Sequence, residues 1–470
     1  MSVSKKDRLL FLLEQGLIFV FLLVFFIRLC PLTIFDADDW SQIRIERLPI
    51  PIWHGWNPSR VFPETLYPLC GRVAAYIFYP LLGDFVQAVR VSCAIALSLL
   101  ITALCVAMNR FLRHRFSFSL TASYLLEICF LAGCFLIFRT RPTSSFLFHA
   151  DNLTCIIHYT CSGVLNGMVI LLMAADADFG KTFMGAALWK KILFGILAYL
   201  AIFSHLFASG MLAVFCFVSL FSDLSFRPSF RTWLKRHLVS LILLGGFLIA
   251  CIFEYFGGRA SAVDDGGMNY AACARQLLAM VKALSKPYAA VLLILFIAVM
   301  VIRRGDGKAR HLLLLFFAWE ILITCYLFLL CSKIPYMSRI EASFGIWFGL
   351  VVLEILCLAL LLKRVPKGSL QRNLILLAAA LSMVFAILPD GRYQRSLPTS
   401  LDPSVCEEMD ETLLSAITQA DRAGQSSVTV NLNGLAQRSD LLLTEGIGQI
   451  VSDTLYYYGI TEGHISVTVQ

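Results

Sequence analysis

The amino-acid sequence predicts an all-α polytopic membrane protein, with about eleven transmembrane helices and a small C-terminal α/β domain. Three observations lead to this fold class. Of the 470 residues, 59% are hydrophobic and only 15% are charged. The mean hydropathy of +0.77 lies far above that of soluble globular proteins. Apolar runs long enough to cross roughly 30 Å of hydrocarbon recur along most of the chain.

The same composition excludes several other classes. The body of the chain lacks short alternating strands, which excludes an outer-membrane β-barrel. The first apolar run, 9–30, is too long for a signal-peptide core, and no small-residue cleavage site follows it. The net charge of +8 does not predict a nucleic-acid partner, because the basic residues lie scattered in short loops between apolar runs. Most of the 15 cysteines lie inside apolar runs, without the spacing of a metal site.

The expected transmembrane helices follow from these runs. They are 9–30, 84–107, 117–138, 160–175, 192–206, 208–222, 238–255, 288–302, 312–331, 343–362 and 373–389. With this set, all the clusters of Lys and Arg fall on one side of the membrane, which the positive-inside rule makes cytoplasmic. The longer loops 31–83, 139–159, 256–287 and 332–342 then lie outside. The fifth and sixth helices are expected to form a hairpin around His205.

The C-terminal part of the chain differs in character. Residues 1–390 form the membrane domain, and residues 391–470 are polar and read as a small extracytoplasmic domain. The pattern predicts helices over 403–423 and 440–458, and strands over 427–433 and 465–469 that pair with each other. The membrane domain therefore continues into an α-β-α-β unit.

An acidic trio directly after the first apolar run is the leading candidate for a functional site. Asp36, Asp38 and Asp39 fall within four consecutive positions at a bilayer edge, where carboxylates repel one another and are costly to hold. The trio is placed to bind a divalent cation such as Mg²⁺ or Mn²⁺, or to accept a proton from a substrate. The alternative is an ordinary hydrated loop in which acidic and basic side chains balance.

Histidines and an acid near the other expected outer loops extend this candidate site. His149 and Asp151 lie two apart in the second loop, so both can face one cavity. A structural role is the alternative for His149. His205 lies at the turn of the expected hairpin, where it either caps a helix end or belongs to the site.

Arginines at the same side are candidate ligands for a phosphate. Arg60 follows the acidic trio, Arg259 lies in a later loop, and Arg339 with Tyr336 precedes a late apolar run. The planar guanidinium binds phosphate through two parallel hydrogen bonds. For Arg339 the alternative is contact with lipid headgroups. The acids within the apolar runs (Glu14, Glu127, Glu320 and Glu354) are expected to form structural hydrogen bonds inside the bundle.

The layout resembles that of a family of membrane enzymes. One N-terminal span is followed by Asp38-Asp39-Trp40, then by the segment WHGWNPSRVFPETL containing Arg60, and then by further spans. This order, with the hairpin at His205 and the PYMSRI segment before a late span, resembles the GT-C superfamily of integral-membrane glycosyltransferases. The likeness is greatest to the Gtr-type enzymes that modify O-antigens and other surface polymers of bacteria.

This resemblance implies a reaction and a location. The donor would be a polyprenyl-phosphate-linked sugar such as a hexose, and the acceptor a polysaccharide or another glycan. Asp38 or Asp39 would be the general base, with Asp36 in support, and the reaction would invert the anomeric carbon. Arg60, Arg339 or a bound cation would stabilise the departing phosphate. The protein would lie in the bacterial inner membrane among its lipids, with the N-terminus cytoplasmic and the active site and C-terminal domain extracytoplasmic.

Two other functions fit the same class of chain. A transporter or flippase of lipid-linked oligosaccharides predicts polar residues along the whole depth of the bundle, and broken helices in related halves. A polymerase or ligase of surface polysaccharides predicts that Arg and His gather in a later, larger outer loop. Here the first outer loop is the richest in charged residues.

Overall fold

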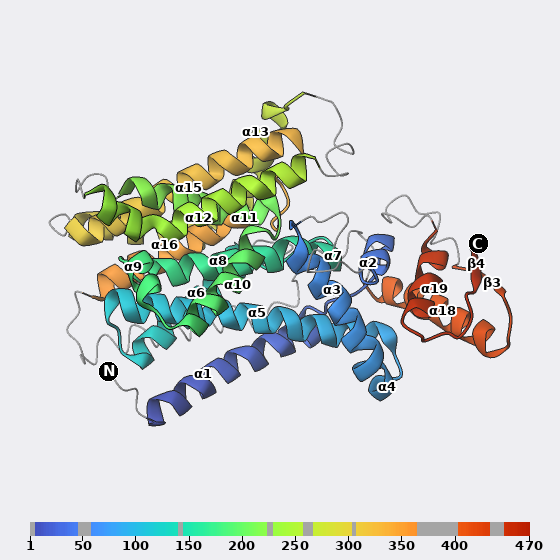
Figure 1. Cartoon of the computed structure of the whole chain (residues 1–470). Helices are drawn as coiled ribbons and strands as arrows, with labels where there is room; N and C mark the ends of the chain where they lie inside the picture. The colour runs from blue at the N-terminus through green and yellow to red at the C-terminus, as the bar shows by residue number, and fades with distance from the viewer. Residues whose placement is uncertain are drawn as a thin grey trace.

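The computed structural model describes residues 5–45, 58–139, 144–222, 229–256, 267–302, 307–363, 403–432 and 446–470. Within them, helices form an elongated bundle, and a small α/β unit lies at one end (Figure 1). Six helical stretches are long and apolar enough to cross a membrane, or seven if one bent pair is a single span. The chain is therefore a multi-pass helical membrane protein, as the composition predicts.

The spans are built from the following elements. Helix α1 (Lys5–Val24) continues as the π-helix η1 (Phe25–Leu29), and α7 (Leu153–Cys155) continues through the π-helix η3 (Ile156–Thr160) into α8 (Cys161–Ala174). The other four lie in α5 (Phe85–Phe116), α12 (Phe230–Tyr255), α15 (Gly307–Lys333) and α16 (Phe344–Leu362). The bent pair is α13 (Tyr270–Ala283) with α14 (Lys286–Ile302), which meet at 89°.

The expected count of eleven spans exceeds the number of full-length helices in the described residues. Three expected spans form shorter helices: α6 (Leu120–Leu136), α10 (Leu188–Ile202) and α11 (Leu206–Ser222). The fourth expected span begins seven residues too late in the prediction, because Thr154, His158 and Thr160 interrupt the apolar run at its start. The last expected span, 373–389, lies outside the described residues.

The hairpin between α10 and α11 has the predicted position, and a buried amide explains its turn. The Asn166 side chain donates to the backbone oxygen of Ala201 at 2.9 Å and to the Ser204 hydroxyl at 3.0 Å. The last backbone oxygens of a helix have no helical donor, and the Asn166 amide supplies a donor to one of them at the end of α10. The turn that carries His205 is therefore held from α8.

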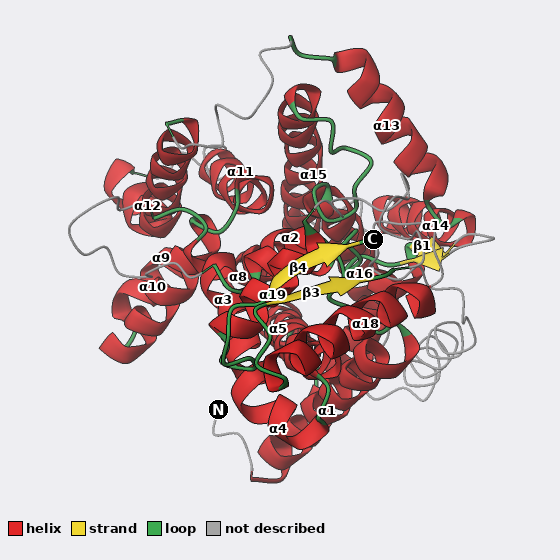
Figure 2. Ribbon diagram, turned by 90° about the vertical axis from the view of Figure 1, so that its right-hand side faces the viewer, coloured by secondary structure: helices red, strands yellow, loops and turns green. Residues whose placement is uncertain are grey.

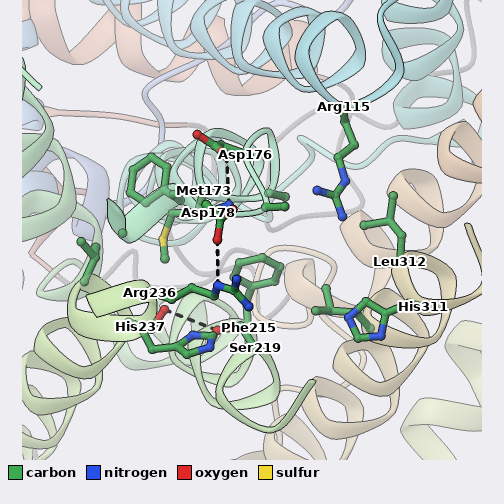
Figure 3. A pocket seen from close by; sticks show the side chains of 17 residues that line it. Arg115, Met173, Asp176, Asp178, Phe215, Ser219, Arg236, His237, His311 and Leu312 are labelled. Atoms are coloured by element: carbon green, nitrogen blue, oxygen red, sulfur yellow. Dashed lines mark hydrogen bonds and ion pairs between the residues drawn. The ribbon is translucent and has the colours of Figure 1, made fainter. Parts of the chain in front are cut away.

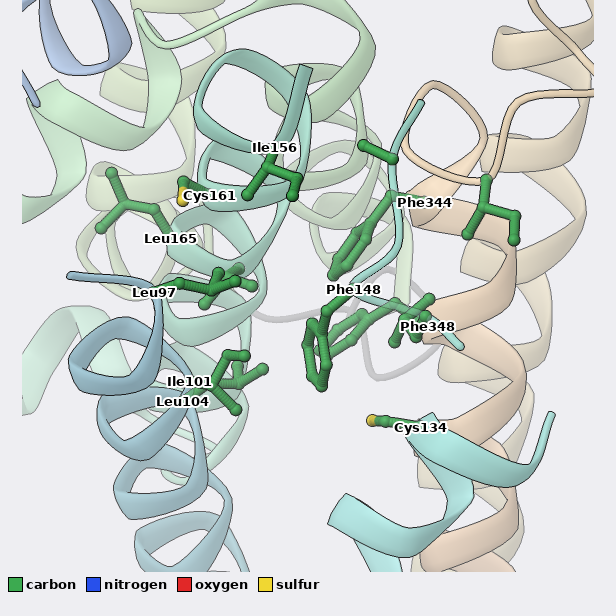
Figure 4. Close-up of a cluster of buried hydrophobic side chains, with 14 of the residues drawn as sticks. Leu97, Ile101, Leu104, Cys134, Phe148, Ile156, Cys161, Leu165, Phe344 and Phe348 are labelled. Atoms are coloured by element: carbon green, nitrogen blue, oxygen red, sulfur yellow. The ribbon is translucent and has the colours of Figure 1, made fainter. Parts of the chain in front are cut away.

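The core of the bundle lies between α5, α8 and α16, as Figure 4 shows. Gly163 and Gly167 stand one turn apart on α8, facing the rings of Phe344 and Phe348. A Cβ at Gly163 would lie 2.6 Å from the Phe344 ring, so the pair of glycines permits this close approach of α16. Phe148, from the loop before α7, reaches into the same core and is fully buried.

The expected outer loops contain short elements that the sequence pattern did not reveal. These are α2 (Ala37–Gln42), α3 (Val61–Val73), the π-helix η2 (Ala74–Phe78), α4 (Tyr79–Leu82), α13, and an antiparallel pair of two-residue strands, β1 (Phe138–Arg139) and β2 (Ser144–Ser145). A further short helix, α9 (Phe179–Gly185), precedes α10. Candidate residues that lie in the described part of the chain are thus carried by segments packed against the bundle.

The C-terminal unit has the predicted order of elements. Helix α18 (Pro403–Arg422) precedes β3 (Ser427–Val430), α19 (Ile447–Tyr457) and β4 (Ser466–Val469). The two strands pair in parallel, Val428 opposite Val467, which is possible because α19 crosses from one to the other. Helix α18 buries one stripe of apolar residues at helical spacing: Cys406, Met409, Leu413, Ile417 and Ala420.

This unit is docked onto α2 (Figure 2). The Trp40 indole donates to the Asp410 carboxylate at 3.3 Å, and the Thr454 hydroxyl donates to the Trp40 backbone oxygen at 2.8 Å. The Tyr458 hydroxyl donates to the backbone oxygen of Ile43 at 2.5 Å. We call the end of the bundle that carries α2 and this unit the α2 end, and the opposite end, where α1 begins, the basic end.

Candidate active site at the α2 end

Two members of the acidic trio hold the first loop against the start of α7. Asp36 is the N-cap of α2, because its side chain accepts from the Asp39 amide at 2.8 Å and from the Asn152 side chain at 2.8 Å. The Asp39 carboxylate accepts from the backbone amides of Thr154 at 2.7 Å and Leu153 at 3.4 Å. Asp39 thus sits at the positive end of α7.

Burial separates this pair from the third acid. Asp36 and Asp39 are 2% and 0% exposed, whereas Asp38 is only half-buried. Burial raises the pKa of Asp36, and it raises the pKa of Asp39 well above its usual range with a further contribution from the Asp36 charge. Asp38 is the member of the trio that a substrate can reach.

The interpretation of the trio as a cation site does not fit this arrangement. The Asp36 and Asp39 oxygens are directed at amide donors, which a bound cation would repel. Among the described residues, no three His, Cys, Asp or Glu side chains are grouped so that they could hold a metal ion. A site for Mg²⁺ or Mn²⁺ made of Asp36, Asp38 and Asp39 is therefore not supported.

A cavity of about 230 Å³ gathers the second group of candidate residues. His149, Asp151, Arg339 and Glu341 line it, with α13 on its far side. The Arg339 Nε donates to Glu341 Oε1 at 2.7 Å and lies 3.3 Å from Asp151 Oδ2. The structure thus brings together His149, Asp151 and Arg339, which lie far apart in the sequence.

Arg339 is held on its other sides by aromatic rings and a thiol. The guanidinium lies 4.7 Å from the centre of the Tyr336 ring and 5.7 Å from that of Tyr159. Its Nη2 lies 2.9 Å from the Cys155 sulfur. The side chain remains 22% exposed, so a ligand in the cavity can reach part of it.

Glu341 lies beneath Arg339 and is 1% exposed at its side chain. Burial raises the pKa of Glu341 to about 7, although the Arg339 charge acts to lower it. For Arg339, burial acts to lower the pKa, but the carboxylates of Glu341 and Asp151 hold it above its ordinary value. The arginine is therefore a permanent cation beside an acid that changes its charge near neutral pH.

The first turn of α7 joins the two groups. Leu153 and Thr154 donate their amides to Asp39, and the next residue, Cys155, contacts Arg339. The acidic trio thus contacts Leu153 and Thr154, and Arg339 contacts the next residue, Cys155. This turn fixes the position of one group relative to the other.

Arg60 was predicted to bind a substrate phosphate, but in the structure it is paired with a carboxylate of the chain itself. Its guanidinium donates to both oxygens of Glu254, at 2.8 Å and 2.6 Å, and the two side chains are 12% and 13% exposed. The backbone of Arg60 is left-handed, with a φ of 61°, which is uncommon for a residue with a side chain. Arg60 therefore ties the start of α3 to the end of α12.

The other candidate residues have these positions. His205 is buried, its ring lies 4.3 Å from that of Tyr159, and its Nδ1 accepts from the Phe207 amide at 3.4 Å. The Tyr336 ring lies 6.1 Å from that of Phe207, so His205 is linked to Arg339 through aromatic side chains. Arg259 lies outside the described residues.

Of the four acids expected to make structural hydrogen bonds inside the bundle, Glu127 makes them, whereas one buried oxygen each of Glu14, Glu320 and Glu354 has no hydrogen-bond partner among the described residues. Glu127 accepts from Gln15 at 2.8 Å and from Asn109 at 2.8 Å. These contacts join α1, α5 and α6, as expected for a buried carboxyl group in a membrane core. They confirm the predicted structural role of Glu127.

Sequence reasoning missed the partners that define this site. The sequence alone does not pair Glu254 with Arg60, and it assigns no role to Glu341, two residues after Arg339. The Asn152 side chain, which links Asp36 to α7, was also given none. Asn is a preferred N-cap residue, and Asn152 directly precedes the apolar run that contains α7. Its side-chain oxygen accepts from the Cys155 amide, as an N-cap does.

Comparisons of the chain with protein-family models, with curated proteins and with solved structures find no match.

Proposed function

We propose that the chain is a glycosyltransferase of the GT-C type, which transfers a sugar from a polyprenyl phosphate to a glycan at the α2 end. The observation that carries this proposal is the first turn of α7, which touches both the acidic trio and Arg339. A reachable carboxylate and a reachable guanidinium at the end of a membrane bundle are the two groups that such a transfer requires.

Asp38 is the proposed general base. Its carboxylate takes the proton of an acceptor hydroxyl, the hydroxyl oxygen attacks the anomeric carbon, and the bond from that carbon to the phosphate oxygen breaks. The anomeric configuration inverts, and polyprenyl phosphate leaves with the bonding electrons. Asp36 and Asp39 act as positioning residues, because their bonds to α7 and Asn152 hold the loop that carries Asp38.

Arg339 is the proposed partner of the donor phosphate. Its Nε is held by Glu341 and Asp151, and its Nη2 by the Cys155 sulfur, so the remaining N–H groups of the guanidinium, chiefly those on Nη1, would bind the phosphate oxygens. Glu341 tunes this contact, since its protonated form removes one negative charge from the neighbourhood of the phosphate. With its pKa raised to about 7, Glu341 changes charge near neutral pH.

The orientation follows from the same proposal. The N-terminus and the basic end would be cytoplasmic, and the active site and the docked C-terminal unit extracytoplasmic, because positive residues gather at the basic end. In this arrangement the shorter helices α6, α10 and α11 also cross the bilayer, as would the expected helix over 373–389, which gives about eleven spans. The donor sugar would be a hexose such as glucose, and the membrane the bacterial inner membrane.

The decisive test is release of polyprenyl phosphate by purified protein in detergent. The protein is incubated with a panel of polyprenyl-phosphate sugars and an acceptor glycan, with and without a chelator. We expect release with at least one donor, undiminished by the chelator. A protein that binds these lipids and releases no polyprenyl phosphate from any of them would contradict the proposal and favour lipid transport.

A further inference from the structure

A second cavity lies at the basic end, far from the proposed active site (Figure 3). Its volume is about 230 Å³, and its walls come from the ends of α5 and α8, from α11, and from the starts of α9, α12 and α15. The ionisable side chains on these walls are Arg115, Arg236, His237 and His311, together with the acids Asp176 and Asp178. Arg115 and Arg236 come from two of the loops in which Lys and Arg cluster, and His311 directly follows a third such cluster.

The two arginines of this cavity differ in their partners. Arg236 donates to Asp178 at 2.8 Å, which neutralises its charge. The Arg115 side chain extends from α5 into the cavity, and neither a hydrogen bond nor an ion pair joins it to another residue in the described ranges. The acid beside it, Asp176, is engaged with the Thr182 hydroxyl at 2.6 Å. An anion is the ligand that this half-buried guanidinium favours.

An apolar groove of about 370 Å³ adjoins the cavity. It runs between α11 and α15 and shares His311 and Leu315 with the cavity. Phe217, Phe221 and Leu314 along it are 46%, 53% and 48% exposed, so the groove opens on the outer surface of the bundle. In a membrane this surface meets the acyl chains of lipids.

We propose that the cavity and the groove together bind one anionic glycerophospholipid from the leaflet at the basic end. The phosphate lies between Arg115 and His311, and an acyl chain follows the groove past Leu315 towards Leu322. Basic pockets between transmembrane helices on the positively charged side of a membrane protein bind lipid headgroups in this way. A soluble anion would use the cavity alone and leave the groove without a role, which is why a lipid is the occupant we infer.

Native mass spectrometry of the whole chain in detergent tests this site. The protein is first stripped of lipid and then titrated with dioleoyl phosphatidylglycerol. We expect one lipid to bind tightly to the wild type. Arg115→Gln should weaken this binding about tenfold, because a hydrogen-bonded charge is lost. Ala318→Phe, which fills the groove from α15, should weaken it to a similar extent.

Matched controls separate this site from general lipid contact. Arg110→Gln removes a charge from the exposed side of the same helix end, and Ile321→Phe adds a ring to the exposed side of α15. Both should bind lipid as the wild type does, and melting temperatures report whether every variant folds. The proposal is overturned if Arg115→Gln and Ala318→Phe, once folded, bind lipid like their controls. It is also overturned if glycerol 3-phosphate binds as tightly as the lipid.

Discussion

At the α2 end the carboxylates of Asp36 and Asp39 are surrounded by amide donors, whereas at the basic end the Arg115 guanidinium faces a cavity. The first arrangement fixes geometry, because each buried oxygen that loses its donor costs free energy. The second leaves a charge available to a ligand. The comparison teaches that charged side chains in a membrane protein hold the fold together where they pair with groups of the same chain. Where they face a cavity instead, they are available to bind a ligand.

The same distinction divides the α2 end itself. Asp36 and Asp39 are buried and hold α2 to α7, while Asp38 and Arg339 remain partly exposed. The predictions below test this division between residues that hold the loop and residues that contact substrate. They are arranged from the largest expected effect to the smallest.

Replacing the reachable acid should abolish transfer without unfolding the protein. Asp38→Asn is expected to lower the rate of sugar transfer by a factor of about 10²–10⁴, because the general base is lost. The free energy of unfolding should change by less than about 1 kcal/mol, since Asp38 is half-buried. Transfer kinetics and thermal unfolding of the same preparation measure both. Full activity in a folded Asp38→Asn variant would remove Asp38 from the reaction.

Replacing the reachable arginine should also reduce transfer. Arg339→Gln is expected to lower the rate by a factor of about 10², because the developing charge on the phosphate loses a donor. Arg339→Lys should retain only part of the wild-type rate, since an ammonium group cannot form two parallel hydrogen bonds to a phosphate. Arg275→Gln, on the exposed side of α13, is the control and should be active. Equal activity of Arg339→Gln and this control would exclude the phosphate contact.

Replacing Asp39, the fully buried acid, should lower the stability of the protein more than replacing Asp38. Asp39→Ala is expected to destabilise the protein by about 2–4 kcal/mol, because the Thr154, Leu153 and Phe35 amides lose their acceptor. Unfolding in detergent, followed by near-ultraviolet circular dichroism, measures the change. A variant as stable as Asp38→Ala would contradict the division between scaffold and reachable acid.

The pH dependence of donor binding should report Glu341. Its pKa is raised to about 7, so the carboxyl group is neutral below that pH and charged above it. The KM for the donor should therefore rise several-fold as the pH increases from 6 to 8, because the carboxylate repels the phosphate. Glu341→Gln should make the KM independent of pH over this range. A wild-type KM that does not vary between pH 6 and 8 would argue against this contact.

Much of the helical architecture could be predicted from the sequence. Apolar runs place most helices within a few residues, because burial in lipid selects continuous apolar segments. The predicted α-β-α-β order of the C-terminal unit was also correct. Its helices and strands can be told apart because apolar residues recur about every 3.6 positions in a helix and every two in a strand. The start of α7 and the short helices α2 and α3 were missed. Helices α2 and α7 are too short, and α3 is too interrupted by Pro and polar residues, to show an apolar helical period. Helix α2 and the start of α7 are also ordered by contacts with distant parts of the chain.

The site could be predicted only in part, for the same reason. The sequence selects Asp39, His149 and Arg339 as charged residues near bilayer edges, but it does not tell which of them face one another. Arg60 looks like a free cation until Glu254, 194 residues later, is seen to pair with it. Likewise Asp38 and Asp39 are neighbours in the chain, yet only the packing of α7 separates a buried acid from a reachable one.

Photo-crosslinking tests the central claim most directly, that the α2 end receives a lipid-linked phosphosugar. A polyprenyl-phosphate sugar with a photoreactive group beside its phosphate is irradiated with the purified protein, and the labelled peptides are identified by mass spectrometry. We predict labels in the peptides that contain Asp151 to Tyr159 and Tyr336 to Glu341, and their loss in Arg339→Gln. Labels confined to the groove between α11 and α15 at the basic end would contradict the account.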